Sequence, residues 1–533
     1  MKKIFLLLLS LALVFLLASC DDMGSDDVPT GGIQYRLSSD GTYAEVVGFK
    51  GLAFKRVIAD TYKDVPVKAI APSAFKDDFF MTLVIPSCVE SIGAEAFSEC
   101  SALKTIRFKG VSQLDSIGDE AFYSCTSLTS ITIPSSVTYI GFDAFRDCWS
   151  LKAVHIEDLE AWCNTSFGIF RFNFPFSNAT NPLHHADNLY LNGELVTELV
   201  IPEGVTSISH GAFYHCASIT SVVIPESVES IDEYAFHYCQ NLESVTIADN
   251  SNLQTIGNDA FSSSASLTSV SFGENSRLLT IGFSAFQFCS SLASIDIPDS
   301  VTSIDSRAFS NCTSITNIAI PDGVTSLAMD TFQLCSGLTN VSFGENSMLQ
   351  TICEDAFSHC TSLTSVTIPD DVTSIEKGAF YGCKALTSIV IPEGVTSIGN
   401  SAFKECSALV SIDIPDSVTS IDSGVFSNCT SLKSIVIPQG TASIQSYSFT
   451  DCTSLESIVI HSGVTFIFPD VFDSCTSLSK IYYGGTAEQW EGINSLSEEI
   501  DTNDATRYYY SESEPTEEGN FWYYDEDGKV AVW

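Results

Sequence analysis

Cysteine is the side chain through which this 533-residue sequence could most readily do chemistry, because 14 of its 18 cysteines recur at one repeated position. Cys406, in the stretch IGNSAFKEC, represents them: it could form half of a disulfide, act as a nucleophile, bind a metal or fill space. The repeated residues are Cys100, Cys125, Cys148, Cys216, Cys239, Cys289, Cys312, Cys335, Cys360, Cys383, Cys406, Cys429, Cys452 and Cys475.

Two features of this column favour packing over pairing. The unbroken run from Cys289 to Cys475 has nine members, and an odd number cannot all pair with a neighbour. The same position also accepts Ser264 and Asp78, so it does not require sulfur. Stacked neighbours would be within disulfide reach, but we expect buried free thiols that behave as small apolar side chains. For Cys88, Cys163 and Cys353, which lie outside the column, a disulfide among themselves or to a nearby thiol stays open.

One cluster of metal-ligand types occurs, on two adjacent repeats: His210, His215, Cys216, His237 and Cys239. A metal site needs about four converging ligands. The cysteines belong to the buried column, and the position of His215 holds Glu99 or Glu405 elsewhere, which predicts a solvent-facing residue. We therefore expect no metal and no cofactor.

Motifs of catalysis are missing from the sequence. It contains no H-E-x-x-H, no G-x-S-x-G and no phosphate-binding G-x-x-x-x-G-K-[ST] pattern. Carboxylates are abundant, but none sits in a recognisable pocket-forming context. We predict a protein with no catalytic residues, and we weigh an enzyme in the 155–200 insert only as a remote alternative.

These residues are positioned by an internal repeat. Segments 386–406, 409–429 and 432–452 align in the frame L-x-x-I-x-I-P-x-x-V-x-x-I-x-x-x-A-F-x-x-C, with a step of 23 residues. Its phenylalanine recurs sixteen times, at Phe75, Phe97, Phe122, Phe145, Phe213, Phe236, Phe261, Phe286, Phe309, Phe332, Phe357, Phe380, Phe403, Phe426, Phe449 and Phe472. A fixed period of this length with this leucine pattern predicts a leucine-rich-repeat solenoid.

Within one repeat, the apolar residues must face inward, because a single coil cannot bury its own apolar edge but stacked coils bury each other's. The inward set of 386–406 is Leu386, Ile389, Ile391, Val395, Ile398, Ala402, Phe403 and Cys406. The I-x-I step predicts a strand that pairs in parallel with the next coil, and Pro392 ends it. The segment 401–406 is expected to form a single helical turn.

The first twenty residues indicate export. Lys2 and Lys3 precede an apolar run at 4–17 that is shorter than the ~20 residues of a membrane-spanning helix. The following L-A-S-C resembles the lipobox of bacterial lipoproteins, and this resemblance makes Cys20 the lipidated mature N-terminus. A plain secretory signal with a chance cysteine is the alternative. Acyl chains on Cys20 would hold the protein on a membrane.

The repeat frame resembles the BspA-like leucine-rich-repeat family of bacterial surface proteins, which shares I-P-x-x-V-T-S-I-x-x-x-A-F-x-x-C-x-S-L, over roughly residues 70–480. The resemblance implies adhesion to host proteins or to other cells, at the cell envelope and on the outer-membrane surface. An envelope scaffold or a glycan-capture lipoprotein is the alternative. The asparagine ladder of commoner leucine-rich repeats is replaced by Gly394, Ser417 or Gly440, so the backbone of that turn must be satisfied from elsewhere.

Breaks in the repeat suggest a division of the chain, and Trp162 and Trp490 mark related segments, each expected to hold a short helix. The predicted parts are a signal peptide (1–19), an acidic tether (20–32), an N-terminal β cap (33–70), repeats (71–154), an enlarged irregular coil (155–200), repeats (201–480) and a C-terminal cap module (481–533) that ends in a hairpin.

Charge and surface composition limit the partners. The formal net charge of -42 argues against nucleic acid or anionic lipid as a partner, and the membrane is reached only through the N-terminal lipid. The outward positions are mostly Ser, Thr and Val, which suits broad contact with proteins or glycans or is simply a β-favouring surface. Aromatic anchor candidates are Trp149, Trp162, Trp490 and Tyr381, of which the three tryptophans could instead plug joins of the solenoid.

Overall fold

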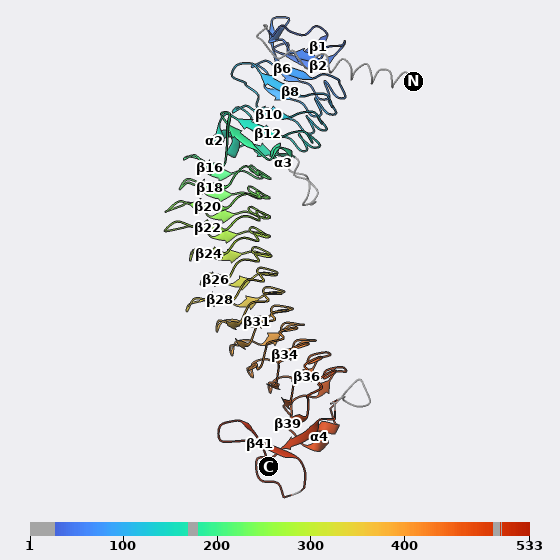
Figure 1. Cartoon of the computed structure of the whole chain (residues 1–533), viewed down its shortest axis with the longest axis vertical. Helices are drawn as coiled ribbons and strands as arrows, with labels where there is room; N and C mark the ends of the chain where they lie inside the picture. Colours follow the sequence, from blue (N-terminus) through green and yellow to red (C-terminus); the bar gives the residue numbers. More distant parts are fainter. Residues whose placement is uncertain (1–26, 169–179, 494–501, 503, 517) are drawn as a thin grey trace, which may run out of the picture.

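Each repeat folds into one coil with two short strands, because its two apolar patterns of period 2 must both face the interior. In a computed structural model the coils stack into one elongated, curved solenoid, from the blue coils to the red coils of Figure 1. The structure describes residues 27–168, 180–493, 502, 504–516 and 518–533. The predicted leucine-rich-repeat solenoid is confirmed.

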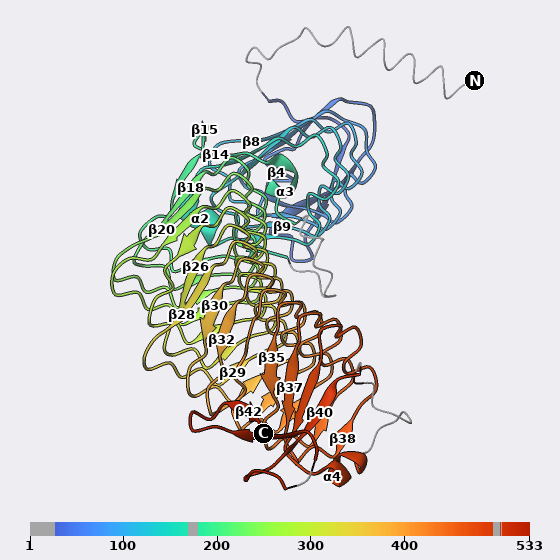
Figure 2. The ribbon, with the colours of Figure 1, turned by 60° about the horizontal axis from the view of Figure 1, so that its bottom comes forward.

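The first strand of each coil belongs to a parallel ladder that we call the long-strand face (Figure 2). In register, Ser365 pairs with Ser388 and Val366 with Ile389. Its strands are β3 (Lys55–Val57), β6 (Thr82–Ile85), β8 (Thr105–Phe108), β10 (Ser130–Ile133), β12 (Ala153–Ile156), β14 (Leu189–Leu191), β16 (Glu198–Val200), β18 (Ser221–Ile224), β20 (Ser244–Ile247), β22 (Ser269–Ser271), β24 (Ser294–Ile295), β26 (Asn317–Ile320), β28 (Asn340–Phe343), β30 (Ser365–Thr367), β32 (Ser388–Val390), β35 (Ser434–Val436), β37 (Ser457–Ile460), β39 (Lys480–Tyr483) and β40 (Thr506–Tyr510).

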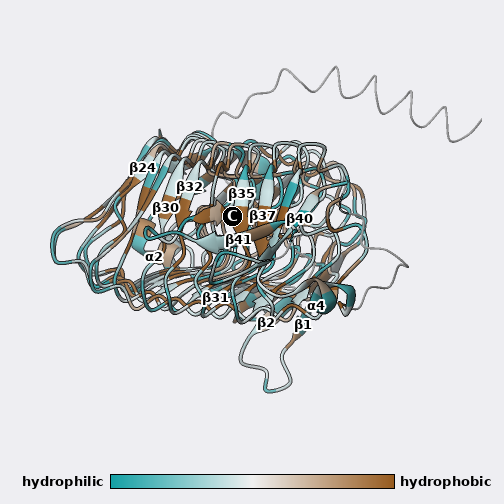
Figure 3. Ribbon diagram, turned by 90° about the horizontal axis from the view of Figure 1, so that it is seen from below, coloured by the Kyte–Doolittle hydropathy of each residue, from teal (hydrophilic) through white to brown (hydrophobic). Residues whose placement is uncertain are grey.

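The second strands form a parallel short-strand face, in which Ser374 pairs with Ser397 and Ile375 with Ile398. Its members are β5 (Val65–Ile70), β7 (Ser91–Ile92), β9 (Ser116–Ile117), β11 (Tyr139–Ile140), β13 (Ser166–Phe167), β17 (Ser207–Ile208), β19 (Ser230–Ile231), β21 (Thr255–Ile256), β23 (Thr280–Ile281), β25 (Ser303–Ile304), β27 (Ser326–Leu327), β29 (Thr351–Ile352), β31 (Ser374–Ile375), β33 (Ser397–Ile398), β34 (Ser420–Ile421), β36 (Ser443–Ile444) and β38 (Phe466–Ile467). Viewed from one end, strands of both faces alternate between apolar and polar residues (Figure 3).

The interior is a continuous apolar column, and all eight residues predicted to face inward in 386–406 are buried. The sixteen repeated phenylalanines are buried as well, in two stacked rows. Phe75 to Phe145 form the first row and Phe213 to Phe472 the second, with ring centroids 5.2 Å apart in the tightest pairs and 6.0 Å in the loosest. Identical offset stacking in every coil fixes the register of the whole stack.

The cysteine column packs the core and also forms a ladder of hydrogen-bond donors. The Sγ of Cys406 donates to the carbonyl oxygen of Phe380 in the preceding coil at 3.3 Å, and Cys429 does the same to Phe403 at 3.2 Å. Where serine replaces cysteine, the Oγ of Ser264 donates to Phe236 at 3.0 Å. The prediction of free thiols is confirmed for the described cysteines, none of which is in a disulfide. In addition, the repeated position holds a side chain that donates a hydrogen bond to the preceding coil.

Burial makes these thiols unreactive. It raises the pKa of Cys429 to about 12 and that of Cys406 well above its usual range, so neither forms a thiolate near neutral pH. The off-column Cys88 and Cys353 are only half-buried, and burial raises their pKa as well.

The segment 401–406 is not the helical turn that the sequence predicts. Ser401 and Glu405 adopt left-handed φ angles of 58° and 62°, and the N–H groups alternate between two kinds of acceptor. Those of Ala402 and Lys404 bond within the coil, whereas those of Ser401 and Glu405 donate to the next coil at 3.0 and 2.8 Å. The left-handed residues turn alternate N–H groups along the solenoid axis, which creates a third ladder between coils that we call the turn face.

Serine and threonine hydroxyls replace the missing asparagine ladder. The Oγ of Ser417 donates to the carbonyl oxygen of Val395 at 2.7 Å. In the coil with Gly440, the neighbouring Thr441 donates to Val418 at 3.3 Å. The carbonyls of Val395 and Val418 are thus satisfied from the following coil.

Both tryptophan segments contain the expected short helix. Helix α2 (Leu159–Cys163) begins at Asp158, whose side chain caps it, and buries Trp162, which donates to Ala212 at 2.9 Å. Helix α4 (Ala487–Glu491) begins with a capping box at Thr486 and buries Trp490. Trp162 therefore fills the core at the join between the two sets of repeats, and Trp490 closes the core near its C-terminal end. Helix α3 (Leu183–Ala186) lies between β13 and β14, and β15 (Glu194–Leu195) pairs antiparallel with β14.

Antiparallel strands cover both ends of the stack. At the N-terminal end β1 (Ile33–Leu37) and β2 (Ala44–Phe49) form a hairpin, β2 continues the ladder in parallel with β5, and β4 (Thr61–Tyr62) pairs with β5. At the other end β41 (Phe521–Tyr524) and β42 (Val530–Val532) form the predicted hairpin. Trp522 on β41 packs on Val459 and Tyr482 and thus covers the outside of the last long strands.

The thiol ladder predicts an asymmetry between two small substitutions. Cys406→Ser should keep the donor to Phe380, as Ser264 does naturally, and lose little stability. Cys406→Ala removes the donor and leaves a small cavity, which should cost about 1–2 kcal/mol. Hydrogen exchange of amides in 380–429 should therefore be about tenfold or more faster in Cys406→Ala only. A serine variant that exchanges faster than the alanine variant would contradict the donor role.

Candidate functional site

Three surfaces deserve comparison as binding sites: the long-strand face, a gap within it, and a groove on the turn face. The long-strand face presents outward valines between serines and threonines, and the valine side chains are well exposed, as with Val390 at 59% and Val436 at 46%. This agrees with the flat, weakly charged surface that the sequence predicts. It offers shape but no concave site.

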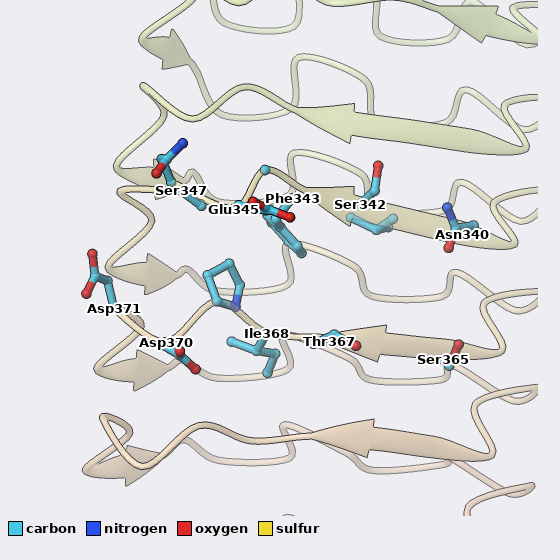
Figure 4. Close-up of a pocket in the computed structure, with 14 residues that line it drawn as sticks. Asn340, Ser342, Phe343, Glu345, Ser347, Ser365, Thr367, Ile368, Asp370 and Asp371 are labelled. Atoms are coloured by element: carbon cyan, nitrogen blue, oxygen red, sulfur yellow. The ribbon is translucent and has the colours of Figure 1, made fainter.

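The gap lies between β28 and β30, which pair only at Asn340 and Ser365 and then diverge (Figure 4). It has a volume of about 790 Å³, and Phe343 and Ile368 lie at its floor between the two coils. The repeat that contains β28 has a step of 25 residues instead of 23, and its extra residues widen the turn that follows β28. Its carboxylates, Glu345, Asp370 and Asp371, lie at one end, and nothing among the lining residues provides a compensating cation. We regard the gap as a consequence of the longer repeat.

The groove on the turn face has a volume of about 520 Å³ and is rich in rings; we call it the aromatic groove. Its lining comes from α3 and from the turns of five successive coils. The residues are His184, Tyr214, His215, Tyr234, His237, Tyr238, Asp259, Ser262, Ser263, Phe283, Ser284, Gln287, Phe288 and Arg307.

Stacking between coils builds its wall. Tyr214 and His237 occupy equivalent positions, and their ring centroids lie 5.3 Å apart with planes 11° from parallel. His215 and Tyr238 form the next column, at 4.7 Å and 10°. His184 of α3 caps the first column, 5.5 Å from Tyr214. The side chain of His215 faces the groove and is 28% exposed, because His184 of α3 in the enlarged coil covers part of it.

The backbone at the second left-handed position presents these rings outward. His215, Tyr238 and Phe288 all stand there, with φ near 61–62°. This conformation costs an ordinary residue roughly 1–2 kcal/mol, so the fold imposes the strain whichever side chain is present. Glutamate or serine occupies this position in other coils. The large rings are therefore specific to these coils, where they build the groove.

Several polar atoms of the groove have no hydrogen-bond partner among the described residues. They include Oγ of Ser284, which is 1% exposed, and Nδ1 of His184 and of His237. Burial raises the pKa of Asp259 to about 6, and Arg307 pairs with Asp330 at 3.0 Å. The groove therefore offers aromatic surface together with unpaired polar groups and little net charge.

The residues singled out from the sequence lie in different environments in the structure. Trp162 and Trp490 are buried and plug the core, whereas Trp149 is 71% exposed and packs edge-on against His185. Tyr381 is partly exposed and donates to Glu405 at 3.0 Å. Cys20 lies outside the described residues. The described part of the chain holds no group of three or more histidine, cysteine or acidic residues arranged to bind a metal, and within it no helix is long and apolar enough to cross a bilayer.

Sequence reasoning missed the groove because it treated the position of His215 as uniformly exposed. The signal was present: two residues after the repeated phenylalanine, the chain has His215, Tyr238, Phe288 and Leu334 within six coils. The contribution of His184 could not be read from the repeat, since it comes from α3.

Comparison with known proteins gives one family match. The family described as "BspA type Leucine rich repeat region (6 copies)" matches residues 68–177, 186–279, 254–386 and 373–492, which is well over half of the chain. No curated protein matches the sequence significantly.

Similar chains occur among solved structures, and the first of the following supports the fold. A leucine-rich repeat protein from Bacteroides ovatus is 25% identical, with 87% of this chain and 100% of that chain covered and a TM-score of 0.54. A leucine rich cell surface protein from Faecalibacterium prausnitzii is also 25% identical, over 91% of this chain and 100% of that one, with a TM-score of 0.34. The pneumococcal vaccine antigen PcpA is 18% identical over 92% and 95%, with a TM-score of 0.26.

The histidines of the groove predict a loss of stability in acid. Burial lowers the pKa of His184 and His237 to about 4, so the unfolded chain binds their protons first. Stability should fall as the pH drops from about 6.5 to 4, by about 3 kcal/mol for each histidine. The raised pKa of Asp259 acts in the opposite direction over part of this range.

The variant His237→Gln, which copies Gln287 at the equivalent position, should reduce the pH dependence of thermal unfolding between pH 7 and 4.5. Lys404→Gln, at the equivalent position four coils beyond the groove, removes no histidine and is the matched control that should leave that dependence as it is. Equal slopes for wild type and His237→Gln would show that the groove histidine does not titrate as described.

Proposed function

Because the chain belongs to the BspA-type leucine-rich-repeat family, we propose that it is a lipid-anchored protein of the bacterial cell surface that binds other proteins through its solenoid. The observation that carries the proposal is the completely filled interior. Among the described residues, the inward positions from the first row of phenylalanines to the last are packed, so the outside is left to act, and it is a long regular surface.

The anchoring follows from the first twenty residues. A positive start, an apolar run too short to span and the L-A-S-C step together favour lipidation of Cys20 over a plain secretory signal. The acidic residues after Cys20 then form a tether, and the outer surface of the outer membrane is the proposed place. Host or microbial surface proteins are the proposed partners, and adhesion is the proposed role.

Lipidation can be tested directly in bacteria that express the full chain. Wild-type protein should incorporate a clickable palmitate analogue and remain with the membrane fraction, because acyl chains are transferred to the cysteine of a lipobox. Cys20→Ala should lose both label and membrane association. Cys88→Ala, which removes a half-exposed cysteine elsewhere, is the control and should keep both. Label retained in Cys20→Ala would refute the anchor.

The role in protein binding needs a separate experiment. The soluble chain 27–533 should bind a defined set of purified host matrix proteins with saturable affinity. Binding of polysaccharides alone, with no protein partner, would overturn adhesion to proteins.

A second candidate function, capture of glycans, is favoured by one specific observation, the aromatic groove. Sugar rings present C–H faces that pack on aromatic surface and hydroxyls that need hydrogen-bond partners. Phe288 and Tyr238 provide the first, and Ser284 with the unpaired histidine nitrogens provides the second. At about 4.8 Å per coil, five coils span roughly 19 Å, which is long enough for a short oligosaccharide.

This candidate makes a localised prediction. On a glycan array followed by calorimetry with any hit, Phe288→Ser and Tyr238→Ser should each weaken binding at least tenfold, because stacking surface is lost. His359→Ser changes the same left-handed position outside the groove and should bind like wild type. Equal affinities of all variants would place the glycan elsewhere, and an empty array with intact protein binding would remove this candidate alone.

A further inference from the structure

The N-terminal end of the solenoid differs in charge from the rest. Residues 27–110 contain ten basic and ten acidic residues, whereas 111–533 contain twelve basic against fifty-three acidic. Nearly all of the net negative charge thus lies on the coils beyond the first repeats. A negatively charged surface would repel those coils but not the N-terminal end.

The same end exposes several large apolar side chains. Leu52 is fully exposed, Phe54 and Phe79 are exposed, and the rings of Phe54 and Phe79 meet edge to face at 6.2 Å. Val28 is also exposed and lies next to Asp27, which bonds to Lys55. We call Val28, Leu52, Phe54 and Phe79 the apolar ridge. Lys50 and Lys104 are exposed nearby, on the same loop as Leu52 and beside Met81.

A buried arginine holds the ridge in place. Arg56 is 1% exposed, its guanidinium lies 3.5 Å from the ring of Phe49, and it pairs with Asp78 at 3.2 Å. It also donates to the carbonyl oxygen of Ala53, between the two ridge residues of that loop. This explains why Asp78 replaces cysteine in the first coil. With the loop fixed from inside, Leu52 and Phe54 stay on the surface.

The proposed lipid anchor would bring a membrane to this end. Asp27 is fixed to the coils by Lys55 and Arg107, both at 2.9 Å, and Thr30 donates to Val57 on β3. Only seven peptide steps separate Asp27 from Cys20, and fully extended they reach at most about 25 Å. Acyl chains on Cys20 would therefore keep the ridge within that distance of the lipid headgroups.

We infer that the apolar ridge docks on the bilayer surface, so that the lipoprotein stands on its N-terminal end with the acidic coils directed away from the membrane. This inference rests on the proposed lipidation of Cys20. Apolar side chains flanked by lysines suit the boundary between headgroups and acyl chains. Docking orients the solenoid, and it places the aromatic groove and the outward valines of the later coils toward other cells.

The test replaces the lipid with a tag, so that its outcome does not depend on natural lipidation. Chain 21–533 with an N-terminal histidine tag is attached to vesicles that contain nickel-chelating and brominated lipids, which quench tryptophan on contact. The five native tryptophans all lie at or beyond Trp149 and supply a constant background. Phe79→Trp should show at least twofold stronger quenching of its added fluorescence than the control Tyr447→Trp, an exposed site near the other end.

A second substitution makes the test specific to the ridge. Adding Leu52→Asp to Phe79→Trp should abolish the extra quenching while the tag keeps the protein on the vesicle. Leu52 is fully exposed, so this change should not unfold the cap, and circular dichroism checks that it does not. Quenching of Phe79→Trp no stronger than that of Tyr447→Trp would overturn the docking. Palmitate label retained in Cys20→Ala would instead refute the anchor and leave this result standing.

Discussion

Register between coils is the constraint on which the rest of this structure depends. Each coil must offer the next one the same backbone groups at the same height on three faces, two of strands and one of turns. The side chains that recur are those that serve this contact: Phe403 stacks, Cys406 donates to a carbonyl and Ser417 donates to another. Buried backbone groups are costly to leave unpaired, so one missing donor affects two coils.

The same constraint explains where the chain departs from its repeat. The longer coils add their extra residues in turns, and beside β28 this leaves a gap, because β28 and β30 pair at one position and then diverge. Between the two phenylalanine rows Trp162 keeps the core closed, and at the far end Trp490 and Trp522 cover its inside and outside. Interruptions are possible because large aromatic side chains fill the space that a missing coil leaves.

Function is then left to positions that do not serve the register. On the turn face, the fold fixes left-handed backbone at the positions of Tyr238 and Phe288 but leaves the side chain free. Rings at this position in His215, Tyr238 and Phe288 build the groove, and Ser263 in the coil between Tyr238 and Phe288 also lines it. In the first coils, Arg56 and Asp78 form an ion pair at a core position of the repeat. This pair holds the loop in place and keeps Leu52 and Phe54 on the surface.

The sequence by itself determined the coil, the inward set and the buried phenylalanines and thiols, because a period repeated sixteen times averages out every local exception. It also predicted the helices at Trp162 and Trp490 and the final hairpin. Only the tertiary structure decided that Ser401 and Glu405 are left-handed and that Cys406 is a donor, since both follow from carbonyls one coil away. It also decided that His184 and His215 belong to one groove, because stacking brings together residues that the sequence separates by a full repeat or more.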